Sequence, residues 1–198
     1  MRVPAILTCL AALAAPAAAA APLVVPVPAI EGQPASHLKA RVVAYSGHTN
    51  GDITVEVTNT GATPETFLAQ GLYFVPEGPA NEAPQRVGAV GPILPDGATA
   101  RQAHLEVPPG ARVKVHLDVY CIDSHRHSPS PSTQFNLATT RMPRELAGQI
   151  AHDSGEAARP LGGVSAPAAK GAVQSEVWKN RDKKWIKLEG EGRQEAGK

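Results

Sequence analysis

The stretch VYCIDSHRHSPSPS, residues 119–132, combines a cysteine with two histidines over a short distance. Cys121 ends an alternating run, and His125 and His127 follow it in a segment rich in serine and proline. Thiolate and imidazole are ligands that copper prefers, so this spacing indicates a candidate metal site. The same residues also fit a simpler interpretation, in which a core strand ends and an exposed loop begins.

A type 1 copper site needs a second histidine from an upstream strand and usually a methionine. The Cys-x-x-x-His pattern that begins at Cys121 resembles the copper loop of the cupredoxins. His48, His104 or His116 could supply the upstream ligand, but His116 lies on the outward phase of its strand. Met142 is far along the chain from this loop. A periplasmic copper-handling protein is therefore an alternative hypothesis, and the main interpretation assigns no metal or other cofactor.

Cys121 continues the inward phase of the run ARVKVHLDVYC, together with Val113, Val115, Leu117 and Val119. Free cysteine is among the residues most often buried in protein cores. No basic residue or helix start next to it in the sequence would lower the pKa of its thiol. This pattern favours a buried, unreactive Cys121.

Enzymatic chemistry has little support in the sequence. The chain contains no G-x-S-x-G elbow, no H-E-x-x-H motif and no phosphate-binding loop. Asp118 is outward on its strand and Asp123 lies beyond the strand end, so they do not form a general acid/base pair. We therefore expect no catalytic residues and no enzyme activity.

The N-terminal residues 1–21 predict a secretory signal peptide. Arg2 precedes an apolar run, and small alanine residues follow at the expected cleavage region. No later run approaches the roughly 20 apolar residues that a membrane helix needs, so no integral membrane segment is expected after signal removal. The expected location is secreted or periplasmic. Because Cys9 falls in the signal, Cys121 is the one cysteine expected in the mature chain.

Composition limits the partners. The formal net charge is +1 and aromatic residues make up 4% of the chain, which argues against nucleic acid. The basic segment WKNRDKKWIK contains Trp178 and Trp185 and could bind an acidic glycan or nucleic acid by charge and stacking. Alternatively, the two tryptophans cap the β-domain while the charges face water. The expected partner is a cell-surface or extracellular protein or glycan.

The remaining chain divides by composition and hydrophobic periodicity. Six short runs predict strands, and two of them, GDITVEVTNTGATP and ARVKVHLDVYC, alternate with period two. The other four are KARVVAY, FLAQGLYFVPEG, PQRVGAVGP and RQAHLEV. Of the later segments, RELAGQIAHDSGEAAR carries helical spacing and AVQSEVWKNRD fits a short amphipathic helix or strand. This pattern predicts a mainly β fold, an antiparallel β-sandwich with a small helical C-terminal appendage. The predicted boundaries are a Pro-rich extended segment (22–38), a β-sandwich domain (39–138), a helical or irregular appendage (139–188) and a disordered tail (189–198).

The predicted core follows from the phase of the two clearest strands. In GDITVEVTNTG the residues Ile53, Val55 and Val57 alternate with polar residues, and ARVKVHLDVYC alternates in the same way. Period two places alternate side chains on one face of a sheet. We therefore expect five residues in particular to be buried: Val55, Val57, Val115, Leu117 and Val119.

Two segments of the predicted β-domain carry a family resemblance. DITVEVTNTGATP ends a strand in Asn59-Thr60-Gly61, and VPPGARVKVHLDV later feeds a long strand from Pro109-Gly110. This arrangement resembles bacterial secreted immunoglobulin-like β-sandwich modules over about residues 39–121. The resemblance implies an immunoglobulin-like fold and an adhesion, spacer or accessory role, but no particular ligand.

A second resemblance connects the cysteine to a distant glutamine. YCID (120–123) and VQSEVW (173–178) are similar to the elements of thioester domains in surface adhesins, where the two side chains join. The resemblance implies a thioester between Cys121 and Gln174. Two departures from the pattern are Glu176, where an apolar residue is usual, and the short spacing between the two elements.

The sequence therefore predicts a secreted, non-catalytic binding or structural module of unknown ligand. The two alternative hypotheses are a copper-handling protein that uses Cys121, His125 and His127, and a thioester-forming adhesin that uses Cys121 and Gln174.

Overall fold

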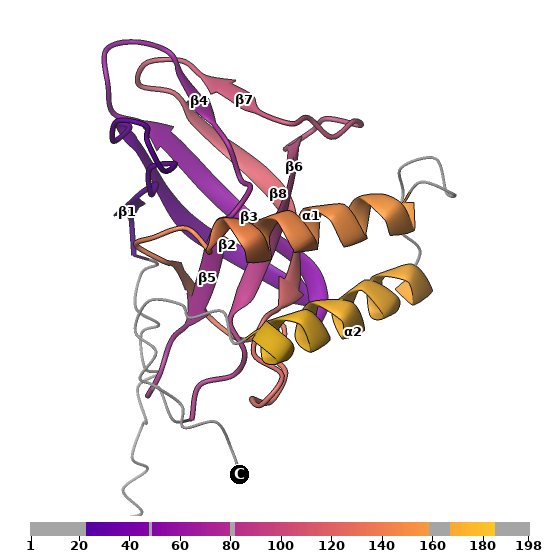
Figure 1. Cartoon of the computed structure of the whole chain (residues 1–198). Helices are drawn as coiled ribbons and strands as arrows, with labels where there is room; N and C mark the ends of the chain where they lie inside the picture. Colours follow the sequence, from indigo (N-terminus) through magenta and orange to yellow (C-terminus); the bar gives the residue numbers. More distant parts are fainter. Residues whose placement is uncertain (1–22, 48, 80–81, 159–166, 185–198) are drawn as a thin grey trace, which may run out of the picture.

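A computed structural model describes most of the chain (Figure 1). The predicted signal peptide (1–21) and the predicted tail (189–198) lie outside the described residues. The described residues are 23–47, 49–79, 82–158 and 167–184.

The described residues form nine β-strands and two α-helices. The six predicted runs correspond to β2, β3, β5, β6, β7 and β8, whereas β1, β4 and β9 are only two or three residues long and were not predicted. The strands are β1 (Val25–Pro26), β2 (Leu38–Gly47), β3 (Asn50–Asn59), β4 (Glu65–Phe67), β5 (Tyr73–Pro76), β6 (Val87–Pro95), β7 (Leu105–Val107), β8 (Arg112–Cys121) and β9 (Phe135–Leu137).

All paired strands run antiparallel, which confirms the predicted mainly β, antiparallel class. Seven strands form one sheet in the order β1-β2-β3-β8-β6-β5-β9, and β4 pairs with β7 separately. The long strands β2, β3 and β8 lie side by side at its centre. The sheet also curls, and this brings β9 back to β2. Tyr45 of β2 and Phe135 of β9 pack edge to face with ring centroids 5.0 Å apart. The finer immunoglobulin-like arrangement stays a prediction.

The inner face of the curled sheet is apolar. The five residues predicted for the core, Val55, Val57, Val115, Leu117 and Val119, are all buried. Period-two alternation is decisive here because β3 and β8 pair in continuous register over nine residue pairs. Cys121 joins the same inner cluster.

The turn residues of the two resemblance segments touch one another. Asn59 is fully buried, and its side-chain Nδ2 donates to the carbonyls of Thr63 and Val107. The backbone N–H of Gly110 donates to the carbonyl of Asn59 over 3.1 Å. Gly110 has a φ of 67°, which glycine adopts without steric cost. Asn59 therefore ties the end of β3 to the turn that feeds β8 and to β7.

Two helices cover part of the outer face, as Figure 1 shows in orange and yellow. They are α1 (Arg144–Ala158) and α2 (Pro167–Lys184), which fall within the predicted appendage. Leu146 and Ile150 of α1 and Val177 of α2 are fully buried, in agreement with the helical spacing. Neither described helix is long and apolar enough to cross a membrane.

A second apolar cluster fills the space between these helices and the sheet. It contains Tyr120, Ile122 and Met142. A Cβ at Gly88 would lie 2.8 Å from the Met142 sulfur, so glycine allows the methionine to approach the strand. The sheet thus has one core on each face, and α1 and α2 belong to the outer one.

Candidate functional site

Cys121 ends β8, the central strand of the sheet, and is fully buried. Its side chain belongs to the inner apolar cluster, as the strand phase predicts. Burial raises the pKa of the Cys121 thiol to about 12, and the negative charge of Asp123 contributes to the rise. At neutral pH the thiol therefore keeps its proton.

Gln174 of α2 lies directly against the backbone of Cys121. Its side-chain Oε1 accepts a 2.9 Å hydrogen bond from the Cys121 N–H, and its Nε2 donates a 2.7 Å hydrogen bond to the Cys121 carbonyl. The same N–H also donates to the carbonyl of Thr49. Gln174 is 2% exposed, so both hydrogen bonds are shielded from water. The side-chain amide thus pairs with β8 as a neighbouring strand would, just before the start of β3.

Polar contacts on either side of Gln174 fix the register of α2. The Lys170 Nζ lies 3.1 Å from the Asp118 Oδ1, one helical turn before Gln174. One turn after it, the Trp178 indole N–H donates to Gln85 over 2.9 Å. The side chains that hold α2 are therefore spaced along one helix face, and they place Gln174 at Cys121.

A buried ion cluster lies next to this junction. The guanidinium of Arg86 binds Asp123 through two hydrogen bonds, from Nε to Oδ2 (2.8 Å) and from Nη2 to Oδ1 (2.6 Å). Arg181 of α2 approaches the same Oδ1 at 3.5 Å. Burial alone would raise the pKa of Asp123, but the hydrogen bonds and charge of Arg86, with the charge of Arg181, hold it below its usual range. The cluster joins α2 to the segment that follows Cys121.

The predicted metal ligands are not brought together. His125 and His127 are exposed in the loop after β8, whereas the Cys121 side chain faces the inner core. His104 is exposed before β7, and His48 lies outside the described residues. Among the residues that the structure describes, no three side chains of metal-binding type gather in one place. The described geometry therefore gives no support to the copper alternative.

Two of the remaining candidates, Met142 and His116, lie on the outer face. Met142 is in the outer cluster, away from the inner cluster that holds Cys121. His116 faces outward as predicted, and its Nδ1 lies 3.2 Å from the Thr54 hydroxyl. Trp178 packs against the inner core, which agrees with a capping role, and Trp185 is outside the described residues.

An acidic pair was missed in the sequence. Asp118 lies directly opposite Asp52 across β3 and β8, and Arg101 lies 2.9 Å from Asp118. Burial raises the pKa of Asp52, and the hydrogen bond that its protonated carboxyl donates to Asp118, with the charge of Asp118, raises it further. The outward phase of both residues was readable, but their pairing depends on the register of two distant strands.

Arg86, Gln85 and Arg181 were also not predicted, because nothing in their local sequence separates them from surface residues.

Comparisons with known proteins identify no relative from which the roles of these residues could be inferred. No family model matches the chain, and neither a curated protein nor a solved structure is significantly similar to it. The two resemblances therefore depend on the residues already quoted and on the contacts that these residues make.

Proposed function

We propose that this chain is a non-catalytic binding module that attaches to its partner through an internal thioester between Cys121 and Gln174. One observation carries the proposal. These residues are 53 positions apart, and the Gln174 amide nevertheless lies within hydrogen-bonding distance of the Cys121 backbone on both its oxygen and its nitrogen. The contact supports the resemblance of YCID and VQSEVW to the thioester-forming elements.

The chemistry is balanced without any added reagent. The Cys121 sulfur attacks the Gln174 side-chain carbonyl carbon, a carbon–sulfur bond forms, and the carbon–nitrogen bond of the amide breaks. The thiol proton leaves with the amide nitrogen, which departs as ammonia. The Cys121 N–H, 2.9 Å from Oε1, is placed to stabilise the negative charge that develops on that oxygen. Because burial keeps the thiol protonated, proton transfer accompanies the attack.

Burial also determines when the proposed thioester would react with a partner. Cys121 and Gln174 are both buried, so water is excluded from a thioester between them. A partner amine reaches the acyl carbon only when α2 moves away from β8. The amine then forms an amide with the Gln174 side chain and the Cys121 thiol is released. Each molecule reacts once, so the module is not an enzyme.

The setting of this function is an extracytoplasmic one. The N-terminal signal pattern supports a secreted or periplasmic location, where a cell-surface or extracellular protein or glycan is the available partner. The proposed fold is an immunoglobulin-like module. The hydrogen bond between Gly110 and Asn59 supports this relationship, because it links the two segments that carry the resemblance.

Methylamine provides the test. In a chain that carries Cys9→Ser, Cys121 is the one cysteine, so the free thiols in denaturant report on it alone. We expect no titratable thiol before treatment and one after methylamine opens the thioester. Gln174→Ala should show one thiol throughout.

Gln149→Ala on α1 is the matched control, since Gln149 is bonded to Asp153 and not to the cysteine. It should behave like the parent chain. A parent chain that shows a full thiol in denaturant before any treatment would refute the proposal.

A further inference from the structure

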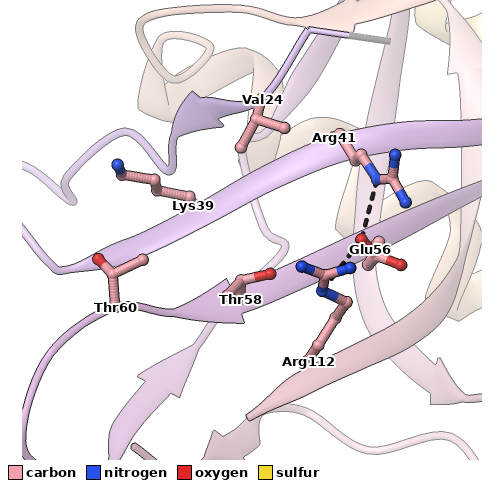
Figure 2. Close-up of a pocket in the computed structure, with 7 residues that line it drawn as sticks. All are labelled: Val24, Lys39, Arg41, Glu56, Thr58, Thr60 and Arg112. Carbon is pink, nitrogen blue, oxygen red and sulfur yellow. Dashed lines mark hydrogen bonds and ion pairs between the residues drawn. The ribbon is translucent and has the colours of Figure 1, made fainter. Parts of the chain in front are cut away.

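A basic pocket opens on the outward face of the sheet, where β2, β3 and the start of β8 lie side by side (Figure 2). Its volume is about 200 Å³, enough for one charged group on a longer molecule. It lies near Arg112, at the opposite end of β8 from Cys121. The lining residues are Val24, Lys39, Arg41, Glu56, Thr58, Thr60 and Arg112.

Strand register creates this pocket. Outward-facing residues directly opposite one another across three neighbouring strands stand in rows, and two such rows meet here. Four of the six residues in these rows are cationic and one is anionic. The rows are Arg41–Glu56–Lys114 and Lys39–Thr58–Arg112.

The single carboxylate is already neutralised. Glu56 is 7% exposed, and its Oε1 lies 2.9 Å from the Nε of Arg41 and 3.5 Å from the Nε of Arg112. The hydrogen bond from Arg41 is the main reason that the pKa of Glu56 lies below its usual value. Both arginines use Nε in these ion pairs, so their terminal Nη groups remain for a ligand. Figure 2 shows the two arginines on either side of Glu56.

The lining also excludes other ligand classes. It contains no aromatic side chain, so it offers no platform on which a nucleobase could stack. An added peptide strand would need a free strand edge, but β1 already pairs with β2 at Lys39. The hydroxyl of Thr58 and that of Thr60, which donates to the His37 carbonyl, can both accept hydrogen bonds from sugar hydroxyls.

We propose that this pocket binds the sulfate or carboxylate groups of an acidic polysaccharide. Arginine guanidinium groups bind such planar or tetrahedral oxyanions through paired hydrogen bonds. Lys39 adds a third cation at the opposite end of the pocket from Arg41. The site stands independently of the Cys121–Gln174 junction and holds its ligand without a covalent bond.

Binding of the full chain to dextran sulfate and to polygalacturonate tests this site. Lys39→Gln and Arg112→Gln should each weaken binding of at least one polymer about tenfold, the loss of one charge-assisted contact. The polymer that binds more tightly identifies sulfate or carboxylate as the preferred group. Both residues are exposed, and Lys39 forms no ion pair within the described part of the chain, so the fold should be retained.

Lys179→Gln is the matched control, because Lys179 is an exposed cation on α2 and its removal changes the net charge equally. It should leave binding within about twofold of the parent chain. An equal loss in Lys179→Gln, or unchanged binding in both pocket variants, would overturn the proposal. Tighter binding of polyglutamate than of either polysaccharide, with the same dependence on Lys39 and Arg112, would overturn the assignment to a polysaccharide.

Discussion

The two faces of the central sheet are stabilised in different ways. The inner face is a continuous apolar cluster in which residues such as Val55 and Val115 are fully buried. The outer face is mixed: α2 is held there by polar contacts of Gln174 and Arg181, besides its apolar side chains. Apolar packing tolerates exchange between residues of similar volume, whereas each polar contact requires one particular partner.

This difference indicates where function lies. The inner face positions β8, and the outer face joins Cys121 to α2 and forms the basic pocket. Substitutions on the inner face should therefore affect folding as a whole. Substitutions on the outer face should affect the position of α2 or ligand binding, with a smaller cost in stability.

The largest effect is expected from Val115→Asp. It places an unpaired charge in the inner core, which should cost more than about 4 kcal/mol and unfold the domain. The neighbouring Lys114→Asp faces outward and should leave the fold intact. Circular dichroism and denaturant titration would measure both, and a folded Val115→Asp protein would show that the inner face is wrongly assigned.

Asp123→Asn should be the most costly change on the outer face. It removes the carboxylate that Arg86 and Arg181 both bind, at an expected cost of about 3 kcal/mol in unfolding free energy. Asp118→Asn, in a more exposed ion pair, should cost less than about 1 kcal/mol. Equal costs for the two variants would mean that the buried cluster has no special role.

The pH dependence of this effect has a definite sign. The pKa of Asp123 is lowered in the fold, so its stabilisation is present above the pKa of an unfolded aspartate and is lost as the pH falls through the lowered value. The stability of the parent chain should therefore approach that of Asp123→Asn in acid. A constant difference from neutral pH to strong acid would contradict the charge pairing.

The sequence predicts the contacts of the inner face better than those of the outer face. The reason is the sequence separation of the residues that interact. Period-two alternation is a local signal, so the burial of Val55 and Val115 could be predicted without knowledge of strand pairing. The bond between Arg86 and Asp123 joins residues 37 positions apart with no periodic pattern. Contact between Cys121 and Gln174 was anticipated only through a family resemblance.

The basic pocket was predictable only in part. Lys39 and Arg41 alternate with buried residues in β2, so their outward orientation can be derived from the sequence. Their meeting with Glu56 and Arg112 depends on the exact register of three strands. The curling of the sheet, which brings Phe135 to Tyr45, depends on the very short β9 and has no local signal.

Trp178→Phe tests the register of α2 with a smaller change. It keeps the aromatic packing and removes the hydrogen bond to Gln85, which is 2% exposed. The expected cost is about 1 to 2 kcal/mol, because a buried amide oxygen loses its donor. Thermal unfolding would measure it, and an unchanged melting temperature would show that this bond does not hold α2.

The smallest effect, and the one stabilising change, is expected from Asp52→Asn. Because the pKa of Asp52 is raised in the fold, ionisation of this carboxyl opposes folding as the pH rises through that value. The variant should be more stable than the parent chain by about 0.5 kcal/mol at neutral pH, since the site is partly exposed. The difference should disappear in acid, and a destabilised variant at neutral pH would contradict this account of the acidic pair.

The intact mass of the folded protein tests the central claim most directly. A thioester between Cys121 and Gln174 makes the chain lighter than its amino-acid sequence by the mass of one ammonia. We expect this deficit in the parent chain and its absence in both Cys121→Ala and Gln174→Ala. A parent chain with the full mass of its sequence would contradict the thioester and leave Gln174 as a structural partner of β8.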